Sequence, residues 1–143
     1  MRRPLSFLYG DSPMTDDELV RCFEAGEAPP DGFHHREHVR VAWWYARQQA
    51  WHVALAKFRD ALRRFAIAQG KPDLYHETIT TAFLVLIAER LDGDARDWTW
   101  EEFAARNADL LTWRPSILDR YYQPETLASD RARRTFVLPD RAT

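Results

Sequence analysis

The segment that decides the fold is residues 51–69, which read WHVALAKFRDALRRFAIAQ. Its apolar side chains recur every three or four positions, at Leu55, Phe58, Leu62, Phe65 and Ala66. An α-helix brings residues three and four positions apart onto one face, so this segment is predicted to be a helix with one side in the core. Gly70 follows as the expected end, because glycine readily adopts the left-handed conformation that closes helices.

The same helical period continues on both sides of this segment, and no stretch shows the two-residue alternation of a strand. Thr15 with Glu18, and Thr99 with Glu102, form capping boxes that predict two further helix starts. Helices are expected over about 15–26, from 33 or 34 through 46, over 51–69, from 72 to about 90 and over 99–111, followed by short helices after Pro115 and Ser129. The sequence therefore predicts an all-α fold, a compact bundle of about four main helices with short C-terminal helices.

Length and composition favour one helical domain over residues 1–143, with its core at about 15–137. The chain is 45% hydrophobic and 29% charged, which is typical of a folded protein. A net charge of −2 provides no attraction to nucleic acid, and the longest apolar run, residues 82–88, is too short to span a bilayer. The expected setting is therefore cytoplasmic, with a small-molecule partner, no nucleic acid, no membrane and an open oligomeric state.

Two further features of the composition concern packing and origin. The single cysteine, Cys22, lies on the apolar stripe of the first predicted helix and is expected to be a packing residue. Arginine outnumbers lysine by 18 to 2, which suggests a bacterial source.

Three histidines form the sharpest functional signal in the sequence. His35 and His38 are three residues apart, so one helix face presents both, and His76 is expected to approach from a facing helix. Three neutral imidazoles suit a divalent transition metal such as iron, copper or zinc and leave coordination positions open for water or substrate. His34 and His52 lie off the apolar faces and are expected at the surface.

Other residues near these histidines are candidates for catalysis and substrate binding. Glu77 is suited to orient a histidine or to complete the metal ligands, and Thr80 and Tyr75 are placed to contact substrate or water. The predicted catalytic residues are thus Glu77, Thr80 and Tyr75. Trp43 and Tyr45 are expected to line an apolar pocket, and Arg133 to bind an anionic substrate group.

The leading interpretation is a small metal-dependent enzyme that acts on an organic molecule, with oxidation favoured over zinc-dependent hydrolysis. One alternative is a non-catalytic helical module that binds a small molecule or a metal. A metal-free histidine acid or base remains open, as do histidines that serve the structure alone.

Three segments together resemble a group of small bacterial helical proteins with F-x-H-x-x-H and Y-H-E-T motifs. They are residues 33–38 (FHHREH), residues 75–80 (YHETIT) and residues 129–140 (SDRARRTFVLPD). The resemblance covers roughly residues 15 to 140. It implies motif positions for His35, His38, His76, Glu77, Ser129 and Arg133, and no particular reaction. The chain is also loosely similar to DinB-like bundles that bind a metal through three histidines, but here the histidine pair precedes the single one.

Overall fold

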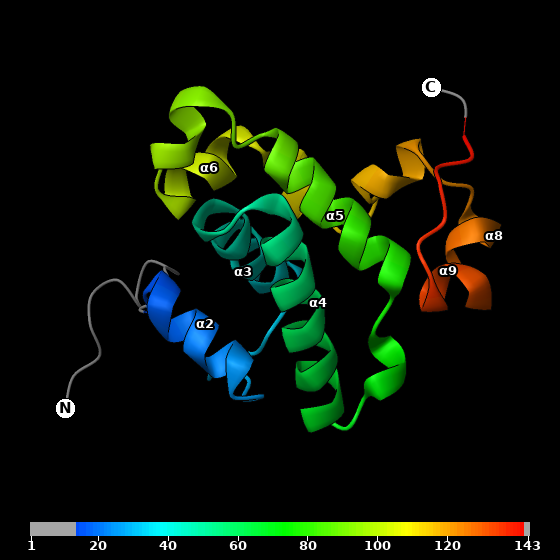
Figure 1. Ribbon diagram of the computed structural model, residues 1–143, viewed down its shortest axis with the longest axis horizontal. Coiled ribbons are helices and arrows are strands. Elements are labelled where there is room, and N and C mark those ends of the chain that lie inside the picture. Colours follow the sequence, from blue (N-terminus) through cyan, green and yellow to red (C-terminus); the bar gives the residue numbers. More distant parts are fainter. Residues whose placement is uncertain (1–13, 142–143) are drawn as a thin grey trace.

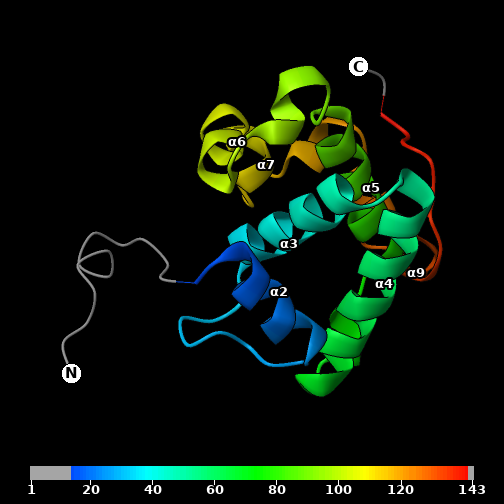
Figure 2. The same cartoon turned by 60° about the vertical axis from the view of Figure 1, so that its left-hand side comes forward.

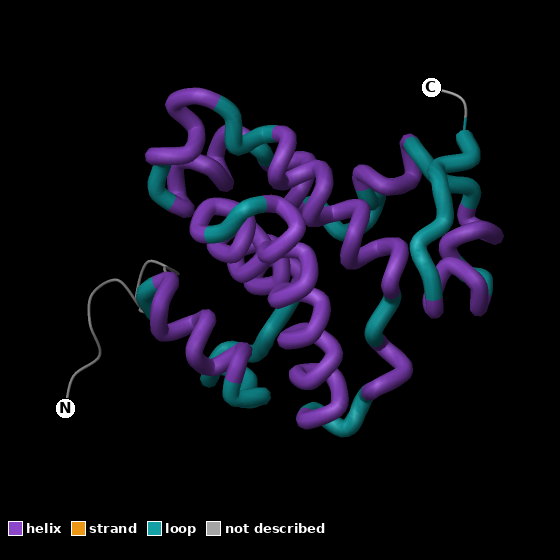
Figure 3. The backbone as a smooth tube through the Cα atoms, in the orientation of Figure 1, coloured by secondary structure: helices purple, strands orange, loops and turns teal. Residues whose placement is uncertain are grey.

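Helix α3 (His35–Gln48) is the element around which the others pack in the computed structural model (Figures 1 and 2). The structure describes residues 14–141, which contain eight α-helices and three short 3-10 helices and no strand (Figure 3). Helices α2, α4, α5 and α7 all contact α3. Five of the described helices have seven or more residues, where the sequence predicted about four main ones. The all-α prediction is confirmed.

The first three helices follow the apolar periods of the sequence. Helix α2 (Asp16–Glu24) begins with the predicted capping box of Thr15 and Glu18, and α4 (Trp51–Ala68) ends just before the predicted glycine. At the start of α3, the backbone N–H of His34 donates to the carboxylate of Glu37 at 2.7 Å. Glu37 therefore caps this helix.

The element that follows α4 is divided in two. A 3-10 turn, η1 (Pro72–Leu74), comes first, and α5 begins only at Glu77 and runs to Glu89. The prediction of one element from residue 72 was wrong here. His76 is the N-cap of α5 with extended backbone, so it lies at the entrance of the helix and not on its face.

The C-terminal half consists of short pieces. After η2 (Gly93–Asp97) come α6 (Trp100–Arg106), α7 (Ala108–Leu111), η3 (Ile117–Arg120), α8 (Pro124–Leu127) and α9 (Asp130–Arg134). The helix predicted over 99–111 is broken at Asn107, whose buried side chain donates to the carbonyl of Phe103 and accepts from Arg90. Helix α9 packs against α5, at the right in Figure 1.

The core lies mainly between α2, α3, α4 and α5. Phe23, Trp43, Leu84 and Ile87 are completely buried there. Leu55 and Leu62, predicted to face inward, are half-buried and pack against this core. Cys22 is half-buried too. None of the helices in the described part is long and apolar enough to cross a membrane.

Candidate functional site

His35 joins the start of α3 to the end of α7. Its Nε2 lies 2.8 Å from the carbonyl oxygen of Leu110, and its ring packs against Phe83 and Trp113 at centroid distances of 5.1 and 4.9 Å. Burial lowers the pKa of His35, and the bond to the carbonyl opposes this effect. A neutral imidazole that donates from Nε2 explains the geometry.

His76 is held by two backbone groups at once. Its Nδ1 accepts from the backbone N–H of Ile79 at 3.1 Å, which caps α5, and its Nε2 lies 2.7 Å from the carbonyl oxygen of Leu127. The side chain is buried, and burial is the main cause that lowers its pKa, with the nearby charge of Arg133 as a smaller one. Both ring nitrogens of His76 therefore have partners within the fold.

His38 differs from the other two. It is half-buried, its ring meets that of Phe33 edge-on at 4.5 Å, and it makes no side-chain hydrogen bond to any residue from 14 to 141. Burial lowers the pKa of His38 to about 4, and positive charge at His35 and His34 contributes. His38 is thus a neutral imidazole at neutral pH, and the lone pair of its unprotonated ring nitrogen is available.

The three histidines face different neighbours. His35 is directed to α7, His38 to the Phe33 ring and His76 to α8. Within residues 14–141, no three or more His, Cys, Asp or Glu side chains are grouped so that they could hold a metal ion. A metal site from His35, His38 and His76 would need the bonds to Leu110 and Leu127 to open. His34 and His52 are exposed, as predicted.

The predicted catalytic residues Glu77 and Tyr75 belong to one buried polar cluster. The Glu77 carboxylate accepts from Arg59 at 3.0 Å, from the Tyr75 hydroxyl at 2.9 Å and from Thr81 at 3.2 Å, and a second Arg59 nitrogen lies 2.7 Å away. Burial first, and then the adjacent Glu77, raise the pKa of Tyr75 to about 12. Thr80 is buried in the first turn of the same helix. This carboxylate has several partners inside the fold.

The predicted substrate-binding residues are separated by the fold. Arg133 donates to the backbone carbonyl of Asp73 at 2.6 Å, which ties α9 to η1. The buried Tyr45 hydroxyl donates to Glu24 of α2, and burial together with that carboxylate raises the pKa of Tyr45. Only Trp43, of these three, lines a described pocket.

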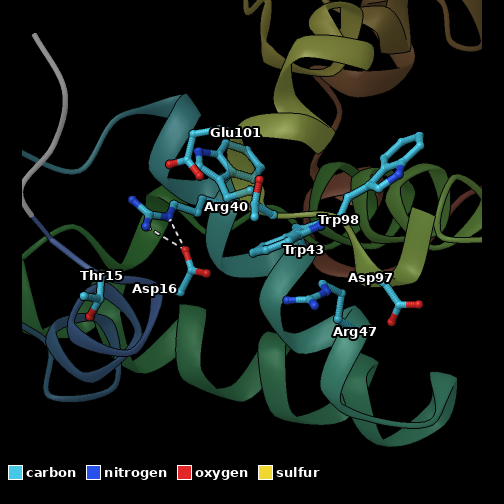
Figure 4. A pocket seen from close by; sticks show the side chains of 10 residues that line it. Thr15, Asp16, Arg40, Trp43, Arg47, Asp97, Trp98 and Glu101 are labelled. Carbon is cyan, nitrogen blue, oxygen red and sulfur yellow. Dashed lines mark hydrogen bonds and ion pairs between the residues drawn. The ribbon is translucent and has the colours of Figure 1, made fainter. Parts of the chain in front are cut away.

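That pocket, here called the tryptophan pocket, is a hollow of about 410 Å³ beside α3 (Figure 4). Its volume is within the usual range of small-molecule sites. Thr15 and Asp16 border it from the start of α2, and the segment between η2 and α6 forms the opposite wall. Its full lining is Thr15, Asp16, Arg40, Trp43, Arg47, Asp97, Trp98, Thr99, Trp100 and Glu101.

Trp43 is the buried base of the tryptophan pocket. Its side chain is completely buried, and its indole N–H has no hydrogen-bond acceptor among the described residues. The guanidinium carbon of Arg47 lies 4.5 Å from the centroid of the Trp43 ring, and Trp100 packs against that ring at 5.5 Å. A buried donor without an acceptor costs roughly 1–3 kcal/mol, so this N–H requires an explanation.

Charges around the pocket are only partly paired. Arg40 forms an ion pair with Asp16 at 2.6 Å (Figure 4). Arg47 donates from Nε to the carbonyl of Arg96 at 3.0 Å, while its two terminal nitrogens bond to no described residue. Arg47 is therefore a guanidinium of the lining without an ion pair among residues 14–141.

Arg40, Arg47, Trp98 and Trp100 line the pocket and were not predicted from the sequence. The sequence does contain a pattern that indicates one wall of this pocket. One face of α3 carries side chains spaced by four, three and four residues, namely Arg36, Arg40, Trp43 and Arg47. Arg36 and Arg47 both lie over tryptophan rings on this face. The wall from η2 and α6 comes from a distant part of the chain, and no local pattern brings it to α3.

Comparisons with known proteins add no relative. Neither the family models, nor the curated proteins, nor the solved structures contain a match to this chain. The class defined by the described residues is an all-helical domain with an arginine- and tryptophan-lined pocket.

Proposed function

We propose that this protein binds a small organic molecule in the tryptophan pocket and acts as a binding module. The observation that carries the proposal is the Trp43 indole N–H, a fully buried donor without an acceptor among residues 14–141, in a side chain that lines a hollow of about 410 Å³. Buried donors are nearly always paired in folded proteins, so an acceptor atom of a ligand is the missing partner that we infer.

A ligand reaches the Trp43 N–H when a lining side chain moves aside. Arg47 is the side chain best suited to move, because it is half-buried, has one hydrogen bond from Nε and lies over the indole ring. A ligand that pairs with the free guanidinium nitrogens would draw Arg47 off the ring.

Nuclear magnetic resonance tests this proposal directly, since each of the six tryptophans contributes one indole N–H signal. A library of small acids, amines and aromatics is screened against the intact protein. Binding in the tryptophan pocket should shift the signals of Trp43, Trp98 and Trp100 and leave that of Trp51 unchanged. Trp51 is 43% exposed, outside the pocket lining, and serves as the internal control.

Two results would overturn the proposal. The first is a library in which no compound shifts the Trp43 signal, and the second is a compound that shifts only Trp51 or Trp113. The variant Trp43→Phe keeps an aromatic ring and removes the N–H, so it should weaken binding roughly tenfold without loss of helical signal. Trp51→Phe is the matched variant and should bind as the unmodified protein does.

The metal-dependent enzyme predicted from the sequence is a second candidate, and His38 is the observation that favours it. Its imidazole is neutral and lacks a hydrogen-bond partner among the described residues, and metal ligation requires such a free lone pair. In this candidate His35 and His76 would leave their carbonyl partners to join His38 around iron, copper or zinc. Glu77, Thr80 and Tyr75 would then act on a bound organic molecule.

Metal uptake by protein without an affinity tag separates the two candidates. Near-stoichiometric binding of one ion, lost in His38→Ala and kept in His52→Ala, would support the enzyme. Less than about one-tenth equivalent of each ion would exclude it. The result of the metal experiment does not depend on the tryptophan pocket, because none of these histidines lines that pocket.

A further inference from the structure

We infer that the tryptophan pocket selects a zwitterion, an amino acid or a related molecule with an ammonium group, a carboxylate and an apolar side chain. This inference rests on the proposed function, because it names the ligand class of the same pocket. It is drawn from the free charges of the lining and their arrangement around the indole rings.

The anionic end of the ligand has one evident partner. Arg47 is the lining cation without an ion pair in the described part of the chain, since Arg40 is already paired with Asp16. The Nε of Arg47 bonds to the Arg96 carbonyl, which leaves the two terminal nitrogens available to a ligand that draws Arg47 off the Trp43 ring. Two parallel nitrogen donors match the two oxygens of a carboxylate.

The cationic end has two carboxylates of the pocket lining as partners. Asp97 and Glu101 line the pocket, are exposed, and form no ion pair or hydrogen bond through their side chains in the described part. Figure 4 shows Asp97 and Glu101 at different sides of the Trp43 indole. A purely anionic ligand would be repelled by both carboxylates, whereas an ammonium group would be attracted to them.

The apolar part of the ligand has a surface between these charges. Trp43, Trp98 and Trp100 line the pocket, and the Trp98 ring extends away from Trp43 in Figure 4. The rings of Trp43 and Trp100 pack on each other and are only 0% and 3% exposed, so a ligand meets this aromatic surface once Arg47 has moved off the Trp43 ring. Aromatic and aliphatic side chains both gain from burial against such a surface.

Three probes that share one benzene ring separate the possible ligands in calorimetric titration of the full chain. Phenylalanine carries both charges, 3-phenylpropionate lacks the ammonium group, and 2-phenylethylamine lacks the carboxylate. Phenylalanine should bind at least roughly tenfold more tightly than either analogue, because each analogue leaves one charged partner unused. Equal binding of phenylalanine and either analogue would overturn the inference.

Matched variants connect each charge to its residue. Arg47→Gln should reduce the affinity for phenylalanine to that for 2-phenylethylamine, and Asp97→Asn combined with Glu101→Gln should reduce it to that for 3-phenylpropionate. Arg131→Gln removes an exposed cation outside the pocket and should leave the affinity for phenylalanine unchanged. Helical circular dichroism confirms that each variant is folded.

Failure of this inference is distinguishable from failure of the proposed function. If none of the three probes binds while another library compound shifts the Trp43 indole signal, the inference that the ligand is a zwitterion is wrong, and the pocket is still a binding site. If no library compound shifts that signal either, both are wrong.

Discussion

His76 and Leu127 are 51 residues apart in sequence, and the imidazole Nε2 of His76 lies 2.7 Å from the Leu127 carbonyl oxygen. Since Nδ1 of the same ring caps α5, one side chain both starts a core helix and ties α8 to it. The C-terminal segment is thus connected to the core by a polar contact at a helix entrance.

The first prediction concerns this double contact. His76→Ala removes a helix cap and a buried hydrogen bond, and should lower the free energy of unfolding by roughly 2 kcal/mol. His76→Asn should lower the free energy of unfolding by less, because asparagine is a good N-cap. Some loss should remain, because asparagine is too short to replace the whole imidazole. Urea denaturation measures both. A change in His76→Ala no larger than that of the exposed-site variant His52→Ala would contradict the prediction.

The second prediction concerns pH and His38. The pKa of His38 is about 4 in the folded chain, below the ordinary value of 6.5, so the unfolded chain binds more protons between these values. The stability contributed by neutral His38 is complete above pH 6.5 and is lost as pH falls toward 4. The lowered pKa values of His35 and His76 act in the same direction.

The size of this effect is measurable by urea denaturation at a series of pH values. The free energy of unfolding should fall by roughly 2–3 kcal/mol across that range through His38. His38→Gln cannot titrate there and should flatten the curve, while His52→Gln provides the matched control. Identical pH curves for His38→Gln and the unmodified protein would show that His38 is not the group responsible.

The third prediction concerns Thr78, which is completely buried in α5. Its hydroxyl donates to the carbonyl of Thr135 at 2.8 Å and accepts from the N–H of Val137 at 3.1 Å. Thr78→Val keeps the side-chain shape and removes both bonds. It should destabilise the protein by roughly 2 kcal/mol and speed hydrogen exchange at the Val137 amide.

Thr80→Val is the matched control for this experiment. Thr80 is a buried threonine of the same helix, and its hydroxyl forms no hydrogen bond within the described residues. Exchange at the Val137 amide should remain slow in this variant. Equal exchange rates in the two variants would mean that the Thr78 hydroxyl does not hold the C-terminal segment.

The fourth prediction concerns the Arg59 and Glu77 pair. Arg59→Met leaves the buried Glu77 carboxylate without its cation, and it should lower the free energy of unfolding by roughly 2 kcal/mol. In the double variant with Glu77→Gln, the free energy of unfolding should fall by less than the sum of the two single changes, because no unpaired charge is left. A double-mutant cycle measures this coupling, and Arg64→Met removes an exposed arginine of the same helix as control. Strict additivity would refute a coupled pair.

Local sequence patterns predicted most helix positions correctly. The capping boxes at Thr15 and Thr99 are present, as is the Ser129 cap of α9. These signals succeed because a cap acts within three residues and an apolar period within one or two turns. Helix α8 and the break at Asn107 were missed. The break involves a bond from Arg90, which is 17 residues away and supplies no local signal.

The sequence by itself determined that His35 and His38 would share one helix, because the apolar period defines which side of a helix faces the core. It predicted that His76 would be buried on a helix face, whereas His76 is buried as the N-cap of α5. It did not determine what each imidazole would meet there. The carbonyls of Leu110 and Leu127, the ring of Phe33 and the far wall of the tryptophan pocket come from other parts of the chain. Only tertiary packing decides which distant groups approach a buried face, because spacing along a helix specifies the direction of a side chain and not its partner.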